Sequence, residues 1–335
     1  MTRVTVLMTV LDGARFVDEA IASVIGQDYE DFELLIVDDG STDATPEILA
    51  RWSSRDPRVR VIRNDRNLGI SRASNVGLAE ARGAYIARLD ADDLCMPERL
   101  RAQVEVLDRE SDVVLVSTNY EVIDERGRVI GKESRADPHD VLAFLMHFSN
   151  ALGGHSQVMY RRDAVLALGA YSEEFEVCVD YDLWSRLVHA GRFVVLPMIG
   201  MRYRLHDGRV SVRKARLQRE SSDRIAYRML IALFGAPPRG DEFDALMWMW
   251  HGDPRWSGGA ARAHRLLVDA YVRCGRPPAR RIVARQWMIG AAALWRMGAR
   301  REAIVYAGYA LRWLSPKQLD PARLRLGQEI EKSGA

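Results

Sequence analysis

Two groups of acidic residues in the first hundred positions directly follow apolar runs. Asp38 and Asp39 come after the run 32–37, and the sequence DADD at 90–93 comes after the run 84–89. Mg²⁺ and Mn²⁺ prefer oxygen ligands and often take only one or two carboxylates, with phosphates supplying further ligands. A cation held by the second group would also stabilise a diphosphate as it leaves. A lone Asp-X-Asp is more often a solvated turn, so the surrounding motifs have to decide.

A third polar stretch, NLGISRASN at 67–75, combines a glycine with an arginine. Gly69 permits an unusual backbone conformation, and Arg72 can reach a bound nucleotide, whereas the start of a surface helix is the plainer interpretation. A carboxylate such as Asp39 can accept a hydrogen bond from a base N–H or a ribose hydroxyl, although turn chemistry explains it equally well. Each motif is weak by itself.

The elements that must position these residues alternate between strands and helices. Such alternation predicts a parallel sheet with helices on both faces, and ligands bind such sheets beyond the carboxyl ends of the strands. Ser41 and Thr42 are candidate N-caps for the second helix. The expected strands are 3–11, 32–37, 59–62, 84–89, 113–119 and 155–161, and the expected helices are 15–27, 46–52, 70–82 and 180–190.

The character of the chain changes after about residue 215. Strand signals end there, and Arg, Ala, Leu, Trp and Met recur at helical spacing, with 281–297 and 300–313 as a candidate helical hairpin. We therefore expect one domain at 1–215 and a helical C-terminal region at 216–335. Most of its tryptophans are expected to pack between helices, namely Trp248, Trp250, Trp256, Trp287, Trp295 and Trp313.

The composition is that of an ordinary globular protein. The 335 residues are 48% apolar and 28% charged, and a net charge of +2 gives no sign of nucleic-acid binding. The cysteines (Cys95, Cys178 and Cys274) lack the spacing of a disulfide framework or zinc site, and neither a signal peptide nor a spanning segment is apparent. We expect a cytoplasmic protein. The sequence leaves open a peripheral attachment at the inner face of the membrane through the C-terminal helices.

Taken in order, the motifs resemble those of the family 2 glycosyltransferases of the GT-A fold, in the bacterial type with DDGSTD and DADD. The matching segments are 4–43, 67–75, 85–100, 169–187 and 203–206, within residues 3–212. The resemblance implies an α/β, Rossmann-like sheet that binds a nucleotide sugar. It also implies inverting, Mn²⁺- or Mg²⁺-dependent transfer, most simply from a UDP-sugar, to the hydroxyl of a glycan or lipid-linked acceptor in polysaccharide assembly.

The resemblance also implies roles for individual residues on the donor side. Asp90 corresponds to the ribose or donor-sugar contact, Asp92 to the metal ligand, and His206 to a histidine near the metal and diphosphate. The residues expected to bind the nucleotide are Thr9, Leu11, Asp38, Asp39 and Arg72. The family commonly has an aromatic residue at the position of Leu11, so the identity of the donor base stays open.

Asp180 matches the acidic residue that the family uses as catalytic base. A base must remove the proton of an acceptor hydroxyl as it attacks the anomeric carbon. From the residues alone, Asp180 is also a candidate N-cap, and Asp182 and Glu176 are alternative candidates for the catalytic base. His155 and Trp184 are candidates for lining the sugar pockets, with core packing slightly favoured for Trp184.

Two other functions fit parts of the pattern. A nucleotidyltransferase would want a glycine-rich loop with a lysine after the first strand, and residues 11–18 hold one glycine and no lysine. A protein that only binds sugar nucleotides, or serves as a scaffold, would not need to keep Asp39, Asp90, Asp92 and Asp180. We therefore expect an enzyme.

Overall fold

A computed structural model describes residues 2–251, 259–275, 278–296 and 299–314. The chain forms two compact units. One, which we call the sheet unit, comprises residues up to Ala143 together with Asn150–Ser222. The other, which we call the helical unit, comprises Phe144–Ser149 and the chain from Asp223 on. The expected boundary at 215/216 lies at the start of helix α9 (Ala215–Phe234), and the division at Ser222 lies inside that helix.

The sheet unit contains a mixed sheet of nine strands in the order β3-β2-β1-β4-β8-β6-β9-β5, with β7 paired to β6. The first four strands are parallel, as predicted, and are β1 (Val4–Val10), β2 (Phe32–Asp38), β3 (Val59–Arg63) and β4 (Tyr85–Arg88). Beyond β4 the prediction of a parallel sheet is wrong, because β8 (Val158–Arg161) is antiparallel to both its neighbours, β4 and β6 (Val113–Ile123). The strand β9 (Arg192–Arg204) then pairs parallel to β6, and β5 (Leu94–Cys95) and β7 (Val129–Glu133) pair antiparallel.

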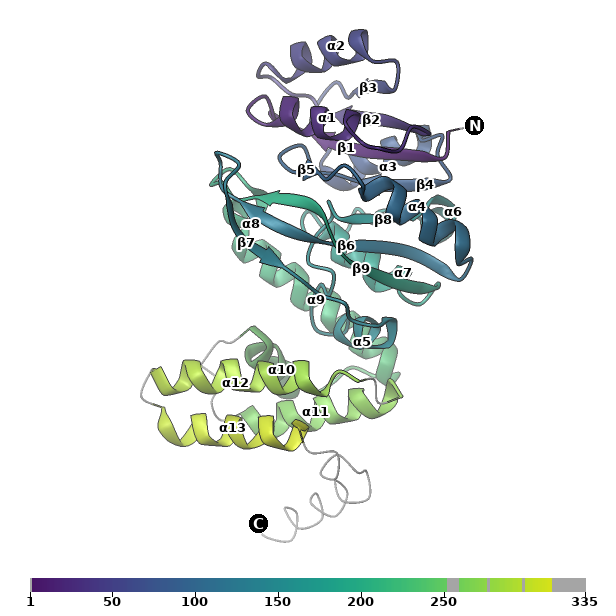
Figure 1. Cartoon of the computed structure of the whole chain (residues 1–335). Helices are drawn as coiled ribbons and strands as arrows, with labels where there is room; N and C mark the ends of the chain where they lie inside the picture. The colour runs from purple at the N-terminus through teal and green to yellow at the C-terminus, as the bar shows by residue number, and fades with distance from the viewer. Residues whose placement is uncertain (1, 252–258, 276–277, 297–298, 315–335) are drawn as a thin grey trace. The chain divides into compact units, whose positions relative to one another are not determined.

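Helices cover both faces of the parallel part, as the sequence predicts (Figure 1). In α1 (Val17–Ile25), Val17, Ala20, Ile21 and Val24 are buried at helical spacing. They share one core with α2 (Thr45–Arg55), α4 (Arg99–Arg109) and the even-numbered side chains of β1. The odd-numbered Leu7 faces α3 (Ile70–Glu80), where a Cβ on Gly77 would lie 2.2 Å from Leu7 Cδ1. Glycine at this position therefore allows α3 to approach the sheet closely.

The loop before α2 corrects a prediction about capping. Neither Ser41 nor Thr42 caps the helix, which begins at Thr45 without a side-chain cap on the preceding residue. Ser41 Oγ instead accepts a hydrogen bond from Asp12 N at 2.9 Å, and Thr42 N donates to Asp12 Oδ1 at 2.7 Å. The two residues therefore join the loops that follow β1 and β2.

The long strand β9 was not predicted from the sequence. Its segment contains Pro197 and Gly200, which argue against a central strand. Gly200 lies against β6, where a Cβ would meet Thr118 Oγ1 at 2.2 Å, and the register of the two strands shifts near this point. Close packing against β6 therefore outweighs the local sequence preference.

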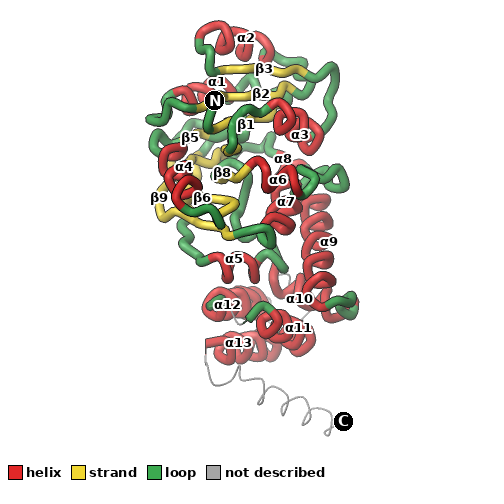
Figure 2. The backbone as a smooth tube through the Cα atoms, turned by 90° about the vertical axis from the view of Figure 1, so that its right-hand side faces the viewer, coloured by secondary structure: helices red, strands yellow, loops and turns green. Residues whose placement is uncertain are grey.

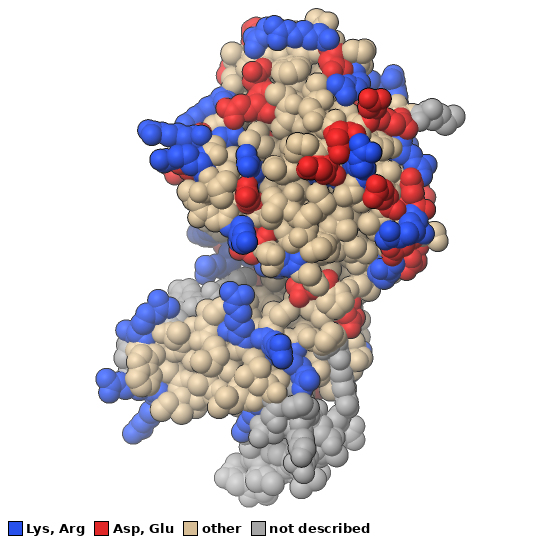
Figure 3. All heavy atoms as spheres, viewed as in Figure 1, with Lys and Arg blue, Asp and Glu red and all other residues tan. Residues whose placement is uncertain are grey.

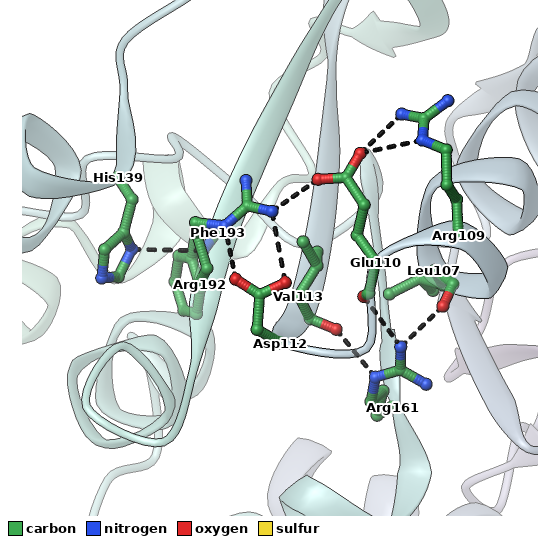
Figure 4. A network of polar contacts seen from close by, with 9 residues as sticks. All are labelled: Leu107, Arg109, Glu110, Asp112, Val113, His139, Arg161, Arg192 and Phe193. Carbon is green, nitrogen blue, oxygen red and sulfur yellow. Dashed lines mark hydrogen bonds and ion pairs between the residues drawn. The ribbon is translucent and has the colours of Figure 1, made fainter.

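The start of β9 is held by a network of arginines (Figure 4). Arg192 Nε donates to Asp112 Oδ2 at 2.8 Å, and its Nη2 pairs with Glu110. Arg161 Nε donates to the carbonyl of Val113 at 2.7 Å. The contacts of Arg192 join the start of β9 to the residues just before β6, and that of Arg161 joins the end of β8 to the first residue of β6.

The remaining helices of the sheet unit are short. They are α6 (Arg162–Ala167), α7 (Val179–Leu187) and α8 (Val210–Arg213), and α5 (His139–Leu145) ends inside the segment that belongs to the helical unit. The helix α7 follows the loop that leaves α6 and carries the candidate base, Asp180.

The helical unit contains helices and no strand in its described residues (Figure 2). They are the end of α9, then α10 (Gly240–His251), α11 (Ala260–Arg273), α12 (Arg280–Arg296) and α13 (Arg300–Leu314), so the expected helical C-terminal region is confirmed. Trp250, Trp287 and Trp313 are buried, whereas Trp295 is 56% exposed, which corrects the packing expected for it. The side chain of Trp248 and all of Trp256 lie outside the described residues. Among the described residues, no helix has the length and apolar character needed to cross a membrane.

Candidate active site

The two acidic groups lie at one edge of the sheet because the strands before them are parallel neighbours. β1 pairs with β2 on one side, with Val10 opposite Asp38, and with β4 on the other, with Leu7 opposite Arg88. The turn 90–93 therefore follows β4 at the same edge as Asp38 and its neighbour. This is the edge at which sheets of this kind bind ligands.

Asp39 fixes the loop that leads into α3. Its Oδ1 accepts hydrogen bonds from Asn64 Nδ2 at 2.8 Å and Leu68 N at 3.0 Å, and its Oδ2 accepts one from Gly69 N at 2.9 Å. Gly69 has a φ of +88°, which favours glycine. The carboxylate thus joins the end of β2 to the NLGISRASN motif and sets the shape of the edge.

Asp38 is buried and retains an acceptor oxygen without a partner. Its Oδ1 accepts a hydrogen bond from Ser41 N at 2.9 Å. Its Oδ2 has no hydrogen-bond partner among the described residues and lies 3.7 Å from Arg63 Nε. Such a buried acceptor is costly unless another group satisfies it.

The other expected nucleotide contacts have different surroundings. Thr9 is half-buried near the end of β1, and Leu11, just beyond it, is 44% exposed. Arg72 lies on α3, and its guanidinium forms an exposed ion pair with Glu173, at 2.7 Å. The structure thus gathers Thr9, Leu11 and the β2 carboxylates at the edge, while Arg72 is engaged by the loop before α7.

Asp90 is half-buried and lies among other carboxylates. Its pKa is raised to about 6, chiefly by removal from water and also by the negative charges of Asp92 and Asp180, against the opposing effect of the Arg88 guanidinium. Arg88 Nη2 is 3.7 Å from Asp90 Oδ1. The electrostatic effect of Asp180 places it in the neighbourhood of Asp90, although the two are 90 positions apart in the sequence.

Asp92 and His206 are in direct contact. Asp92 Oδ2 is 2.8 Å from His206 Nε2, and the imidazole packs against the ring of Phe16 with centroids 4.9 Å apart. The described residues hold no group of three or more acidic, histidine or cysteine side chains around one point. A carboxylate and an imidazole fit a cation that takes its other ligands from phosphate and water.

Asp93 supports the turn from inside. It is buried, and its Oδ1 accepts a hydrogen bond from Arg204 N at 2.9 Å. Its Oδ2 has no hydrogen-bond partner in the described part of the chain, and burial together with the charges of Asp92 and Asp90 raises its pKa well above the usual value. The surroundings of the turn therefore disfavour ionisation of its carboxyl groups, and a bound cation would favour it.

Asp180 lies in the first turn of α7 rather than at its N-cap, which is Cys178 with a φ of +57°. Its Oδ2 accepts a hydrogen bond from Asn150 Nδ2 at 2.8 Å. Burial raises the pKa of Asp180, and hydrogen bonds from the backbone and from Asn150 oppose that rise. Asp180 is therefore not the N-cap residue of α7, although its carboxylate accepts backbone hydrogen bonds within the first turn, and the neutral amide of Asn150 holds it in place.

The two reserve candidates for the base are paired with cations. Asp182 is fully buried and contacts Arg186 Nη2 at 2.7 Å, and Glu176 pairs with Lys214. Asp180 has no ion pair with lysine or arginine in the described residues. Of the three carboxylates, it is the one whose charge no side chain neutralises directly.

Arg88 is a site residue that sequence reasoning missed. It is fully buried, and its Nη1 donates to the carbonyl of Leu7 at 3.0 Å. Its Nε and Nη2 have no hydrogen-bond partner within the described residues. Its signal in the sequence is an arginine inside the apolar run 84–89, next to the DADD turn.

Arg204 and Ser156 were also missed, and both hold the DADD turn. Arg204 Nε donates to the carbonyl of Asp92 at 2.9 Å, and its Nη2 pairs with Glu19 at 2.8 Å. Ser156 Oγ accepts a hydrogen bond from Asp90 N at 3.0 Å. Their partners are 66 or more positions away, so local patterns carry no sign of these contacts.

A buried polar layer lies near these residues. His155 Nε2 and Tyr171 Oη are 2.7 Å apart, and Tyr171 Oη is 3.2 Å from Tyr160 Oη. Trp184 is fully buried, with its ring centroid 5.8 Å from that of His155. His155 and Trp184, considered for the sugar pockets, therefore pack in the interior.

Comparison with known proteins identifies relatives of the chain. A family model described as "Glycosyl transferase family 2" matches residues 5–169. The O-antigen biosynthesis glycosyltransferase WbnJ of Escherichia coli is 30% identical over 209 residues, which are 61% of this chain and 80% of that protein. The succinoglycan biosynthesis protein ExoO of Rhizobium meliloti is 34% identical over 219 residues, 62% of each chain.

Solved structures show the same fold. TarS 1–349 of S. aureus, in complex with UDP-GlcNAc, matches with a TM-score of 0.60 at 17% identity, over 93% of this chain and 91% of that one. The mannosyltransferase PcManGT of Pyrobaculum calidifontis, in complex with GDP-Man and Mn²⁺, matches with a TM-score of 0.55 at 18% identity, over 93% and 87%. The predicted GT-A fold, followed by a helical C-terminal region, is thereby confirmed.

Proposed function

Since the chain belongs to glycosyl transferase family 2, we propose that it moves a sugar, with inversion and with the help of a divalent metal, from a nucleotide diphosphate to an acceptor hydroxyl. It is a glycosyltransferase, and its relatives include proteins of polysaccharide biosynthesis. The proposed acceptor is a growing glycan or a lipid-linked sugar in the assembly of such a polymer.

The observation that carries the proposal is that Asp92 and Asp180 both lie near enough to Asp90 for their charges to raise its pKa. The negative charges of Asp92 and Asp180 both raise the pKa of Asp90, although Asp180 lies on α7, far away in the sequence. Asp182 and Glu176, close by in the sequence, are neutralised by Arg186 and Lys214. Carboxylates crowded together are costly in a folded protein, and a cation and a reacting hydroxyl give them a use.

Asp92 and His206 are the residues proposed to hold the metal, which would be Mn²⁺ or Mg²⁺. When bound, the metal would stabilise the negative charge of the leaving diphosphate. The pair fits this role because its two ligand atoms, 2.8 Å apart, leave most coordination positions to phosphate oxygens and water. The Mn²⁺ in the complex of PcManGT, which has the same fold, supports the proposal.

Asp180 is proposed to accept the proton of the acceptor hydroxyl. The acceptor oxygen forms its bond to the anomeric carbon while the bond from that carbon to the diphosphate breaks, so no covalent enzyme intermediate arises. A carboxylate whose pKa is raised by burial is a stronger base in its ionised form. Asn150 donates to its Oδ2 and would hold the other oxygen toward the acceptor.

The nucleotide is proposed to bind along the ends of β1 and β2. Thr9 and Leu11 would face the base, Asp39 or the partnerless Oδ2 of Asp38 would accept hydrogen bonds, and Arg72 would leave Glu173 for the nucleotide. Asp90 would contact the ribose or the donor sugar. The structures of TarS with UDP-GlcNAc and with UDP support a UDP-sugar, whereas that of PcManGT contains GDP-Man.

A panel of UDP-, GDP-, dTDP- and CMP-sugars, each with and without Mn²⁺, tests this function. A donor present at about a hundredfold its dissociation constant should stabilise the fold by roughly 2.7 kcal/mol, and the stabilisation should require the metal. Release of the free nucleotide from the same donor should follow. Stabilisation by a donor without hydrolysis or transfer to any acceptor would instead indicate a protein that only binds sugar nucleotides.

A further inference from the structure

The hairpin of α12 and α13 exposes large apolar side chains on its outer side. Trp295 is 56% exposed, and Ile304 and Leu311 are each 65% exposed. Met288, Ile289 and Val305 are exposed to lesser extents. We call these six residues, together with the exposed Arg281, Arg285, Arg300 and Arg301, the α12–α13 outer face.

The folding of the hairpin does not require this outer face. The hairpin already buries Trp287, Tyr306 and Trp313. The rings of Trp287 and Tyr306 pack against each other, and that of Trp313 packs against Tyr271 of α11. A helix that faces water on one side normally carries polar residues there. On α12 the exposed positions 281, 285, 288, 292 and 295 form one stripe at helical spacing, with arginine at one end and tryptophan at the other.

Arginine is almost the sole charged residue of these two helices. α12 and α13 contain seven arginines and one acidic residue, Glu302, which is half-buried. Figure 3 shows blue side chains around a tan surface at α12 and α13, with no red among them on the face in view. The outer helices of the sheet unit differ, since α4 exposes acidic as well as basic residues.

The apolar and basic parts of the outer face meet where the two helices are joined. The guanidinium of Arg300, on α13, lies over the ring of Trp295, on α12, at 5.6 Å. Tryptophan and arginine side by side suit the boundary between lipid headgroups and acyl chains, because the indole is amphipathic and the guanidinium binds phosphate.

We propose that the α12–α13 outer face binds the surface of a membrane that contains anionic lipids. The apolar side chains would enter the headgroup region, and the arginines would contact lipid phosphates. A second copy of the chain fits less well, since a symmetric contact would set arginines against arginines. A nucleic acid fits less well too, because Ile304 and Leu311 offer it neither stacking nor hydrogen bonds. The proposal stands on this surface and does not depend on the transfer chemistry.

Flotation of the full-length chain with lipid vesicles tests the proposal. We expect binding to vesicles of phosphatidylcholine mixed with phosphatidylglycerol, and much weaker binding to phosphatidylcholine alone. The variant Trp295→Ser/Ile304→Ser/Leu311→Ser should lose binding to both. In Arg281→Gln/Arg285→Gln/Arg301→Gln, each lost charge should weaken vesicle binding about fivefold, or about 1 kcal/mol. Added salt should also weaken the binding of the wild type.

Matched controls lie on the sheet unit. Ile130→Ser/Leu166→Ser replaces residues that are 57% and 42% exposed, and Arg216→Gln removes an arginine whose side chain is 90% exposed. These variants should bind vesicles like the wild type. Because every replaced side chain is exposed, thermal unfolding and transfer to a soluble acceptor should stay unchanged in all variants, which separates this proposal from that of the catalytic site.

Three results would overturn the proposal. The first is equal binding of the wild type to vesicles with and without phosphatidylglycerol, or to neither. The second is binding that both outer-face variants retain. The third is a dimer in sedimentation that the apolar variant dissociates while no vesicle binding occurs, which would assign the face to a second copy of the chain.

Discussion

The sheet unit contains two groups of acidic residues that the fold treats in opposite ways. At the carboxyl end of β4, Asp90 and Asp93 have raised pKa values because removal from water and neighbouring carboxylates both disfavour their ionised forms. At the start of β6, Glu110 and Asp112 have lowered pKa values, chiefly because Arg192 donates hydrogen bonds to both (Figure 4). The first group is crowded with negative charge, and the second is matched with positive charge.

The difference separates a candidate functional site from a structural ion-pair network. Exposed ion pairs such as that of Arg192 contribute little to stability individually, because a modest attraction is offset by lost side-chain entropy. The group at β4 does impose a cost, since its carboxylates repel one another while Arg88 is the main cation nearby. Perturbed carboxylates in such an arrangement mark sites that bind cations or move protons.

The largest effect is expected from Asp92→Asn. The replacement keeps the size of the side chain and removes the proposed metal ligand, so turnover should fall below detection. UDP affinity, measured with and without Mn²⁺, should lose its dependence on the metal. The matched change Asp112→Asn, in the other group, should leave both properties intact. A metal effect that persists in Asp92→Asn would remove Asp92 from this role.

The next effect concerns the base. In Asp180→Asn, transfer should fall by about 10²- to 10⁴-fold, because a general base typically contributes that much. Donor affinity should survive, since the proposed nucleotide contacts lie on β1, β2 and α3. The control is Asp182→Asn, which should lower stability by leaving the Arg186 guanidinium without its carboxylate. If Asp182→Asn abolishes transfer in a folded protein while Asp180→Asn retains it, the base is misassigned.

A smaller effect is expected from Asn150→Ala, which removes the hydrogen bond to Asp180. Because that bond favours the ionised carboxylate, its loss should raise the pKa of Asp180. The acid limb of the pH–rate profile should then move to higher pH, so that the loss of rate is largest on the acid side of the profile. A uniform loss of rate without movement of the limb would indicate a merely structural role.

The smallest expected effect is a change in thermal stability. Its sign differs between the acidic group at the end of β4 and the acidic group just before β6. Asp90 has a folded-state pKa of about 6, above its usual value near 3.8, so its ionisation costs stability as pH rises through 6. Without metal or donor, Asp90→Asn should therefore raise the melting temperature at pH 7 by roughly 2 °C, allowing for solvent screening. The gain should vanish below pH 4.

Asp112→Asn should behave in the opposite sense. Its carboxyl has a lowered pKa, so its stabilising contribution is present at neutral pH and is lost as pH falls. The replacement should lower the melting temperature slightly at pH 7, and high salt should reduce the difference. Melting curves of the two variants across pH would contradict the comparison if both changes had the same sign.

The sequence by itself determined the parallel part of the sheet and the location of its acidic turns. The runs before Asp38 and Asp90 are short and apolar, and each element there is defined by local periodicity. Parallel strands bring their carboxyl ends to one edge, so the donor side followed from the chain order. The helical character after residue 215 was predictable for the same reason, because 3.6-residue spacing is a local signal.

Tertiary structure decided which charges are neutralised and which are left without a partner. Asp180 and Asp182 are alike in the sequence, yet Asp182 faces Arg186, and Asp180 faces Asn150 and the charge of Asp90. Nor does local pattern distinguish the exposed Trp295 from the buried Trp287, both on α12. Such differences depend on contacts between residues far apart in the chain, and those contacts form only when strands and helices pack. The sequence therefore supplies the reactive groups, and packing decides which of them remain available to react or bind.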